Sequence, residues 1–306
     1  MRATAVRLSL RAFDYVQGFD DWIYLVKAVV AGTETVVAKA FYSPARPARK
    51  KCKHELPRDV ALPSAMPALC AGYMDYVLSS DQIKSVFRRD AIQLNGKNTE
   101  SETVNRIVQT MTRLGVECYL FGSRRLGFDR VDSDWDILLV SARNPSLLLE
   151  HIRSAAGHDA RFFSESECNA RGRRYARQPG GLDEHVLARL FRHTTPYLQC
   201  SEGEIGVFFA HGDDTLVHHD LGELAHQPRH RLRGVVLPNQ GDSFRLPRRV
   251  LLRDSRSRIH SIESLLWELG GVEQCIGVQL AFSGLARLGT SSWWMGGPAA
   301  ALEIVA

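Results

Sequence analysis

The pattern of hydrophobic positions changes along the chain, and near the N-terminus it follows the two-residue period of β-strands. The apolar runs WIYLVKAVV and TVVAKAFY are joined by AGTE, whose glycine suits a tight turn. Residues 22–42 are therefore predicted to form a β-hairpin. Before them, Val6, Leu8 and Leu10 alternate with polar residues, which predicts a half-buried strand. The same arginine-containing, acid-poor segment also fits a transit peptide.

Helical spacing begins near residue 99. Thr99 and Glu102 form a capping box with Thr99 as the predicted cap, and apolar residues follow at helical intervals until Gly115 ends the helix. Runs rich in β-branched and aromatic residues predict strands over 116–121, 135–140 and 204–210. Helical patterns recur over 145–155 and 184–193. The predicted order from residue 99 is helix, strand, Gly-Ser turn, strand, helix.

The last part of the chain combines arginines with apolar segments. IESLLWELGG predicts a helix capped by Ser261 and closed by Gly270. We therefore divide the chain into an N-terminal β-rich accessory module (1–95), a central core (96–215) and a C-terminal accessory region, basic and then helical (216–306). The arginines between 229 and 258, and the basic loop at 46–53, fit a phosphate backbone or a solvated face with ion pairs equally well.

The composition indicates the cellular compartment and the kind of partner to expect for this protein. The six cysteines form no CxxC pair, which favours a reducing compartment over a disulfide framework. No apolar run is long enough to span a bilayer, so we expect no membrane partner. These features predict a cytoplasmic protein, with the mitochondrial matrix as the alternative. The net charge of +5 tilts the expected partner towards a polyanion such as RNA.

The chemistry-bearing residues gather in the segment LFGSRRLGFDRVDSDWDILLV. Asp134 and Asp136 are two residues apart at a predicted strand, so their side chains share a face. Two carboxylates held so close repel each other unless a cation lies between them, and a hard divalent ion such as Mg²⁺ fits that requirement.

A candidate anion site precedes this pair. Gly122 and Ser123 directly follow a predicted strand, where a glycine allows close approach of a phosphate and the serine hydroxyl can donate to its oxygens. Arg124 can add a charge-assisted bond to the same anion, as can Arg125, and we favour Arg124. The sequence therefore places anion donors and a metal-binding pair within fifteen residues.

These residues form a familiar pattern. Gly122-Ser123, a spacer of ten residues and Asp134-x-Asp136 in an apolar strand resemble the signature of the DNA polymerase β-like nucleotidyltransferase superfamily, over roughly residues 100–210. The resemblance implies an α+β fold with a polymerase β-like core, a small mixed sheet with helices packed on one side. It implies transfer of a nucleoside monophosphate from a nucleoside triphosphate to a hydroxyl. Gly122 and Ser123 would hold the triphosphate, and Asp134 and Asp136 would bind two Mg²⁺ (or Mn²⁺) ions.

The family usually adds a third carboxylate from a later strand. The resemblance assigns this role, as metal ligand and catalytic residue, to Glu204 in GEIGVFFA. Glu202 would share its face, and Asp159 is a further alternative.

Three functions remain open at this stage. The first is a Mg²⁺-dependent nucleotidyltransferase, with RNA favoured over other acceptors. The second is a catalytically degenerate scaffold that binds nucleic acid or the ribosome. The third is nucleotidylation of a small molecule or a protein, of the toxin–antitoxin type. Base preference, acceptor and oligomeric state are left open by the sequence.

Overall fold

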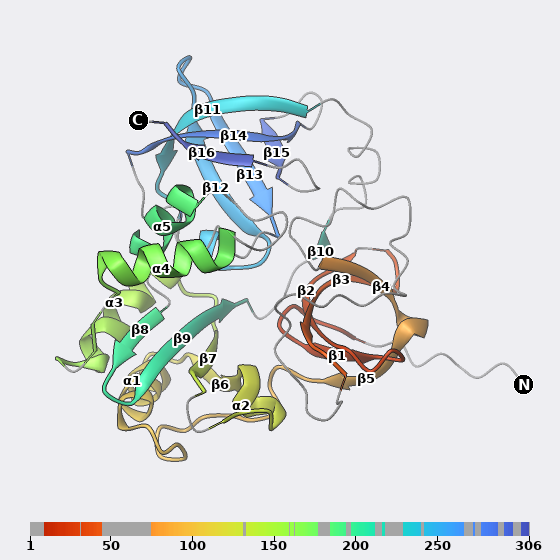
Figure 1. The fold of residues 1–306 in the computed structure, drawn as a ribbon, viewed down its shortest axis with the longest axis vertical. Helices are drawn as coiled ribbons and strands as arrows, with labels where there is room; N and C mark the ends of the chain where they lie inside the picture. Colours follow the sequence, from red (N-terminus) through yellow and green to blue (C-terminus); the bar gives the residue numbers. More distant parts are fainter. Residues whose placement is uncertain are drawn as a thin grey trace, which may run out of the picture.

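The structure is a computed structural model that describes residues 9–30, 32–44, 75–130, 133–158, 160–161, 163–176, 184–193, 197–211, 216–217, 229–239, 242–265, 272, 277–286, 291–295 and 301–305. Within these residues the fold is mixed α+β, with three mostly antiparallel sheets and few helices (Figure 1). The fold class expected from the sequence is confirmed at this level. Figure 1 shows the C-terminal sheet at the top, the N-terminal sheet at the lower right and the helices on the left.

The N-terminal sheet has the strand order β4-β3-β2-β1-β5, and β10 pairs with β2. Its elements are β1 (Tyr15–Gly18), β2 (Ile23–Val30), β3 (Thr35–Tyr42), β4 (Asp75–Ser79), the short 3-10 helix η1 (Ser80–Gln82), β5 (Ile83–Phe87) and β10 (Leu216–Val217). The antiparallel pairing of β2 with β3 confirms the predicted hairpin. The strand predicted at Val6 to Leu10 lies mostly outside the described residues, and Leu10 itself is not in a strand.

The central sheet is small and mixed, in the order β6-β7-β9-β8. Its strands are β6 (Glu117–Phe121), β7 (Trp135–Val140), β8 (Tyr197–Cys200) and β9 (Gly203–Ala210). β6 runs antiparallel to β7, and β9 runs parallel to β7. A parallel neighbour requires a crossover connection, which the chain supplies with helices α3, α4 and α5. The strands predicted at 116–121, 135–140 and 204–210 are confirmed.

Five helices accompany this sheet: α1 (Glu102–Arg113), α2 (Gly122–Leu126), α3 (Pro145–Ala156), α4 (Glu165–Ala176) and α5 (Glu184–His193). The apolar stripe of α1 that the spacing predicted is buried, and with α3 it covers the sheet face that carries Ile137 and Leu139. Burying each such aliphatic side chain stabilises the fold by about 1.5–3 kcal/mol. Gly115 follows α1 with φ of 74°, a conformation that favours glycine.

Two local predictions are wrong. Ser101, and not Thr99, caps α1, because its hydroxyl accepts a hydrogen bond from the main-chain nitrogen of Val104 at 3.1 Å. The helix predicted from Ser261 begins instead as strand β13 (Ile259–Ser264), while its predicted end at Gly270 lies outside the described residues. The C-terminal region, where it is described, consists mainly of strands, and arginines of the predicted basic segment lie on β11 (Arg229–Leu237) and β12 (Arg248–Arg253).

The C-terminal sheet orders its strands β11-β12-β13-β15-β14-β16, and β11 also pairs with β14. The pairings therefore form a closed ring through β11, β12, β13, β15 and β14. The bounds are β11 (Arg229–Leu237), the 3-10 helix η2 (Asp242–Phe244), β12 (Arg248–Arg253), β13 (Ile259–Ser264), β14 (Gln279–Ala286), β15 (Ser292–Trp294) and β16 (Ala301–Ile304). Trp294 and Phe282 are fully buried in it.

The N-terminal sheet packs against the face of the central sheet that α1 and α3 leave uncovered. The Phe121 ring meets the rings of Phe13 and Tyr15 at centroid distances of 5.8 and 5.3 Å. The buried Arg89 side chain spans the two parts, donating to the carbonyl oxygens of Ala12 and His211 at 3.2 and 3.1 Å. The two sheets therefore share one apolar interface.

A buried ion pair links the N-terminal sheet to the C-terminal region. The Lys27 ammonium lies 2.8 Å from an Asp75 carboxylate oxygen and donates to the carbonyl oxygen of Leu265 at 2.7 Å. The exposed fractions of the two side chains are only 2% and 0%. None of the helices in the described part of the chain combines the length and the apolar character that a membrane span needs.

Candidate functional site

The site begins where β6 ends. β6 leads directly into the short helix α2, whose first residue, Gly122, has φ of 67° and is buried. Opposite this junction, Phe121 pairs with Asp136 of β7 in the antiparallel register. Gly122 and Asp136, which have thirteen residues between them in the sequence, therefore lie next to each other in the fold.

The carboxylate of Asp136 lies in a space created by two glycines. A methyl carbon built on Gly122 would lie 2.0 Å from Oδ2 of Asp136, and one built on Gly206 would lie 2.5 Å from Oδ1. Gly206 is the register partner of Asp136 on β9. Any side chain at either position would displace the carboxylate. Gly122 is therefore needed to make room for Asp136, and not only to let a phosphate approach the main chain.

Asp134 immediately precedes β7, and both it and Asp136 are half-buried, as is Ser123. Tyr42, from β3 of the N-terminal sheet, places its hydroxyl near Ser123 and within the electrostatic influence of the two carboxylates. Burial raises the pKa of Tyr42, the negative charges of Asp136 and Asp134 raise it further, and the nearby Ser123 hydroxyl lowers it.

Arg124 is held by the loop before β7. Its guanidinium stacks on the Trp135 ring at 4.1 Å, donates to the carbonyl oxygen of Ser133 at 2.8 Å and lies 3.4 Å from the Asp129 carboxylate. These contacts tie α2 to Asp129, to Ser133 and to the first residue of β7. Arg124 thus supports the shape of the site through its neighbours, and any contact with a triphosphate would have to be made alongside these bonds.

Glu204 lies on the same face of β9 as Gly206, two residues earlier. Its carboxylate is bound by Arg171 of α4, whose nitrogen donates at 2.6 Å. The Arg171 guanidinium also lies 4.0 Å from the Tyr197 ring centroid and 4.9 Å from that of Phe163. The structure therefore shows the predicted third carboxylate in an ion pair.

The alternatives to Glu204 lie elsewhere. Glu202 accepts hydrogen bonds from the Ser101 hydroxyl and from the main-chain nitrogen of Glu102, so it stabilises the N-terminus of α1. Asp159 lies outside the described residues. Across the residues that the structure describes, no group of three or more His, Cys, Asp or Glu side chains is arranged to hold a metal ion. The structure thus brings Asp136 against Gly122, and it pairs the Glu204 carboxylate with Arg171.

Sequence reasoning missed several residues of this region. Tyr15 and Tyr42 come from a module in which no chemical motif was recognised, and Gly206 lies inside an apolar strand. One signal was present: EIGVFFA carries a glycine in a strand interior, which often marks the close approach of another group. Arg125 was passed over in favour of Arg124, although it is the more deeply buried of the two.

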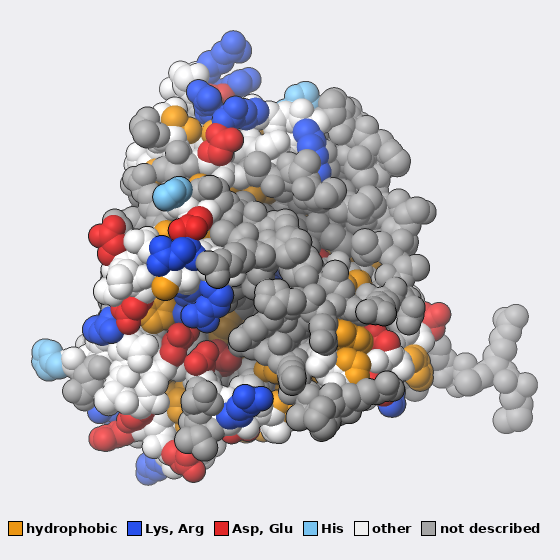
Figure 2. Space-filling model, viewed as in Figure 1, with side chains coloured by type: hydrophobic (Ala, Val, Ile, Leu, Met, Phe, Trp, Pro, Cys, Tyr) orange, Lys and Arg blue, Asp and Glu red, His pale blue; other side chains and the backbone are white. Residues whose placement is uncertain are grey.

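Some of the basic side chains expected to bind a polyanion are exposed, and others are paired with acidic side chains. In Figure 2, Lys and Arg side chains gather at the top of the molecule, where the β12–β13 hairpin carries exposed Arg253, Arg256 and Arg258. Arg258 is paired with Asp254 at 2.9 Å, and Arg231 of β11 is paired with Glu303. The basic loop at 46–53 lies outside the described residues.

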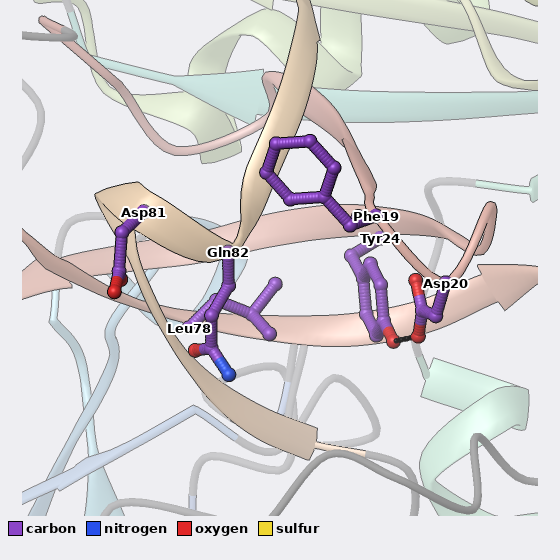
Figure 3. Close-up of a pocket in the computed structure, with 7 residues that line it drawn as sticks. Phe19, Asp20, Tyr24, Leu78, Asp81 and Gln82 are labelled. Atoms are coloured by element: carbon purple, nitrogen blue, oxygen red, sulfur yellow. Dashed lines mark hydrogen bonds between the residues drawn. The ribbon is translucent and has the colours of Figure 1, made fainter.

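A cavity of about 230 Å³ lies in the N-terminal sheet. Figure 3 shows Asp20 and Asp81 at its two ends, with Tyr24, Leu78 and Gln82 between them. The Asp20 carboxylate already accepts hydrogen bonds from the Tyr24 hydroxyl and the main-chain nitrogen of Trp22. This cavity shares no residue with the Gly122–Asp136 region.

Comparison of the chain with known protein families, with curated proteins and with solved structures finds no match to any of them.

Proposed function

We propose that the chain is a nucleotidyltransferase that binds a nucleoside triphosphate at the junction of β6, α2 and β7 and transfers its nucleoside monophosphate to an acceptor hydroxyl. The observation that carries this proposal is the position of the Asp136 carboxylate, seated between Gly122 and Gly206 beside Ser123. Two further features support it. The central sheet is small and mixed, and α1 and α3 cover one face, as the resemblance to the polymerase β-like superfamily implies.

Two of the three predicted ligands, Asp134 and Asp136, are suited to a hard divalent cation. Asp134 and Asp136 are half-buried carboxylates, Asp136 lies against Gly122, and oxygen donors of this kind would hold Mg²⁺ or Mn²⁺ together with phosphate oxygens. When bound, the cation would offset the charge of the triphosphate and of the leaving pyrophosphate. Glu204 would have to leave Arg171 before it could act as a third ligand.

The residues of the chain would act by positioning and charge. Ser123 and the main-chain N–H groups of the Gly-Ser turn would donate to phosphate oxygens, and the loop held by Arg124 would keep Asp134 in place. The acceptor hydroxyl would attack the α-phosphorus while the bond to the bridging oxygen breaks. Pyrophosphate would leave, and the hydroxyl proton would pass to water or to a carboxylate of the site. RNA is the favoured acceptor because of the net charge of +5.

The experiment uses the full chain with labelled nucleoside triphosphates, Mg²⁺ or Mn²⁺ and a pool of RNA acceptors. We expect label transfer or pyrophosphate release, and we expect both to be lost in an Asp134→Ala/Asp136→Ala variant. Retained folding of the variant, checked by circular dichroism, makes the comparison valid. Equal signals from the two proteins would refute the proposal.

One observation favours a second function. The ion pair between Glu204 and Arg171, together with the lack of a three-ligand group in the described part of the chain, fits a scaffold that retains the fold without the reaction. Such a scaffold would bind nucleic acid through the arginines of the C-terminal sheet. RNA binding that survives loss of Asp134 and Asp136, with no turnover in the wild-type protein, would favour it.

A further inference from the structure

Two tyrosines of the N-terminal sheet reach the candidate site with hydroxyl groups that no described residue satisfies. Tyr15 of β1 is fully buried, and Tyr42 of β3 is 3% exposed. Neither hydroxyl has a hydrogen-bond partner of normal geometry among the described residues. The main-chain N–H of Gly122 approaches the Tyr15 hydroxyl and Ser123 approaches that of Tyr42, which places both hydroxyls at the Gly-Ser turn.

Packing fixes the two rings in these positions. The Tyr15 ring lies 5.3 Å from the Phe121 ring and 5.8 Å from the Phe41 ring. The Tyr42 ring meets the Phe128 ring, just after α2, at 5.2 Å in an edge-to-face arrangement. Because the rings are held by apolar neighbours, their hydroxyl groups cannot turn away to reach water without disturbing the interface between the two sheets.

A third buried group, the Arg125 guanidinium, is positively charged and would therefore favour a negatively charged ligand. The Arg125 guanidinium lies 5.5 Å from the Tyr15 ring centroid, and the residue is 8% exposed. None of its three nitrogen atoms has a hydrogen-bond partner among the described residues. Hydroxyl and guanidinium donors collected in one buried region match the oxygen atoms of an anion.

An unpaired buried hydroxyl is costly in a folded protein, and a bound ligand is one way in which the missing partner is supplied. The negative charges of Asp136 and Asp134 act on the Tyr42 hydroxyl, so a bare anion would be repelled there. A polyphosphate that carries a divalent cation meets both requirements. Its oxygens accept from the hydroxyls, and its cation faces the carboxylates.

We propose that the N-terminal sheet forms the second wall of the nucleotide site, with the Tyr42 and Tyr15 hydroxyls donating hydrogen bonds to the metal-bound polyphosphate. This inference rests on the proposed function and deepens it, because it makes residues 15–42 part of the binding machinery. Binding of the triphosphate would then also hold the N-terminal sheet against the central sheet.

The test compares Tyr42→Phe and Tyr15→Phe with a matched control, Tyr24→Phe. Tyr24 is a buried tyrosine of the same sheet whose hydroxyl already donates to Asp20. Without ligand, we expect the melting temperature to stay unchanged or to rise in the first two variants, because an unpaired buried hydroxyl is removed. We expect it to fall in the control, because a formed hydrogen bond is lost and an acceptor is left unpaired.

Binding is then measured by calorimetry on the full chain. The probes are inorganic tripolyphosphate with Mg²⁺ and a non-hydrolysable analogue of each of the four nucleoside triphosphates. A hydrogen bond to a charged acceptor contributes about 1.5–3 kcal/mol, so Tyr42→Phe is expected to weaken binding by about tenfold or more. Tyr24→Phe is expected to bind like the wild-type protein.

Three possible results lead to three different conclusions. Wild-type affinity in both Tyr→Phe variants, with loss of binding in Asp136→Asn, would overturn the role of the tyrosines and leave the nucleotide site standing. No binding of any probe by the wild-type chain would overturn the inference and the proposed function together. A melting temperature that falls in Tyr42→Phe as far as in the control, with affinity unchanged, would assign the hydroxyl a structural role.

Discussion

Replacing Gly122 with alanine should damage the site in two separable ways. Its φ of 67° lies in the left-handed region, where a residue with a β-carbon pays about 1–2 kcal/mol. The new methyl group would also lie 2.0 Å from Oδ2 and 2.8 Å from Cγ of Asp136. Asp136 must therefore leave its rotamer, at a cost of about 1 kcal/mol. We expect the free energy of unfolding to fall by about 2–3 kcal/mol, and transferase activity to be lost.

Two matched variants isolate these effects. Gly115 has φ of 74°, and no atom lies within 4 Å of the place that an added methyl group would take, so Gly115→Ala should show the backbone cost alone. Gly206 has an ordinary φ, but its methyl group would lie 2.5 Å from Oδ1 of Asp136. Gly206→Ala should therefore displace the carboxylate without the backbone cost of a positive φ.

The assay is urea unfolding of each variant in the wild-type and Asp136→Ala backgrounds, which forms a double-mutant cycle. Removing the carboxylate should relieve about 1 kcal/mol of the penalty of Gly122→Ala, and should leave the penalty of Gly115→Ala unchanged. An equal cost of Gly122→Ala in both backgrounds would refute the claim that this glycine exists to seat Asp136.

Further variants test the surroundings. Glu202→Ala should lower the free energy of unfolding by about 1 kcal/mol, because the N-terminus of α1 loses its hydrogen bonds, and should leave turnover unchanged. Glu204→Gln should lower turnover without unfolding the chain. Urea unfolding and pyrophosphate release measure both variants. Lys27→Met should destabilise by about 3–5 kcal/mol in urea, because the buried aspartate on β4 loses the cation that offsets its charge; a loss under about 1 kcal/mol would show that water reaches the pair. The His260 hydrogen bond holds the pKa of Asp254 well below its usual range. The resulting stability is fully present above pH about 4 and declines progressively as the pH falls below it, so Asp254→Asn should destabilise more at pH about 6 than at pH about 3; equal effects would contradict this.

The sequence was sufficient for elements whose hydrophobic period is clear. The hairpin over residues 22–42, helix α1 and strands β6, β7 and β9 all follow apolar patterns that local physics decides. Strand β13 was missed because two of its three buried positions are polar. His260 and Ser264 face inward beside Ile262, so the alternation of a strand was hidden from a hydrophobicity pattern.

The features that the sequence did not predict depend on contacts between distant parts of the chain. Ser101 and Thr99 both fit a capping position, and what favours Ser101 includes Glu202, about a hundred residues later. The same limit applies to the candidate site. Its Gly-Ser turn and aspartates are local in sequence, but Tyr42 reaches them only because the N-terminal sheet packs on the central one, and Arg171 binds Glu204 from α4.

The central claim is that Asp134 and Asp136 face a metal-bound triphosphate held at Gly122 and Ser123. The most direct measurement is a crystal structure of the full chain with Mn²⁺ and a non-hydrolysable nucleoside triphosphate, using the anomalous signal of manganese to locate the ion. We predict manganese peaks bridging the carboxylates of Asp134 and Asp136 and the phosphates, with the phosphates beside Ser123. Manganese and nucleotide bound elsewhere, with these two carboxylates free of metal, would contradict the account.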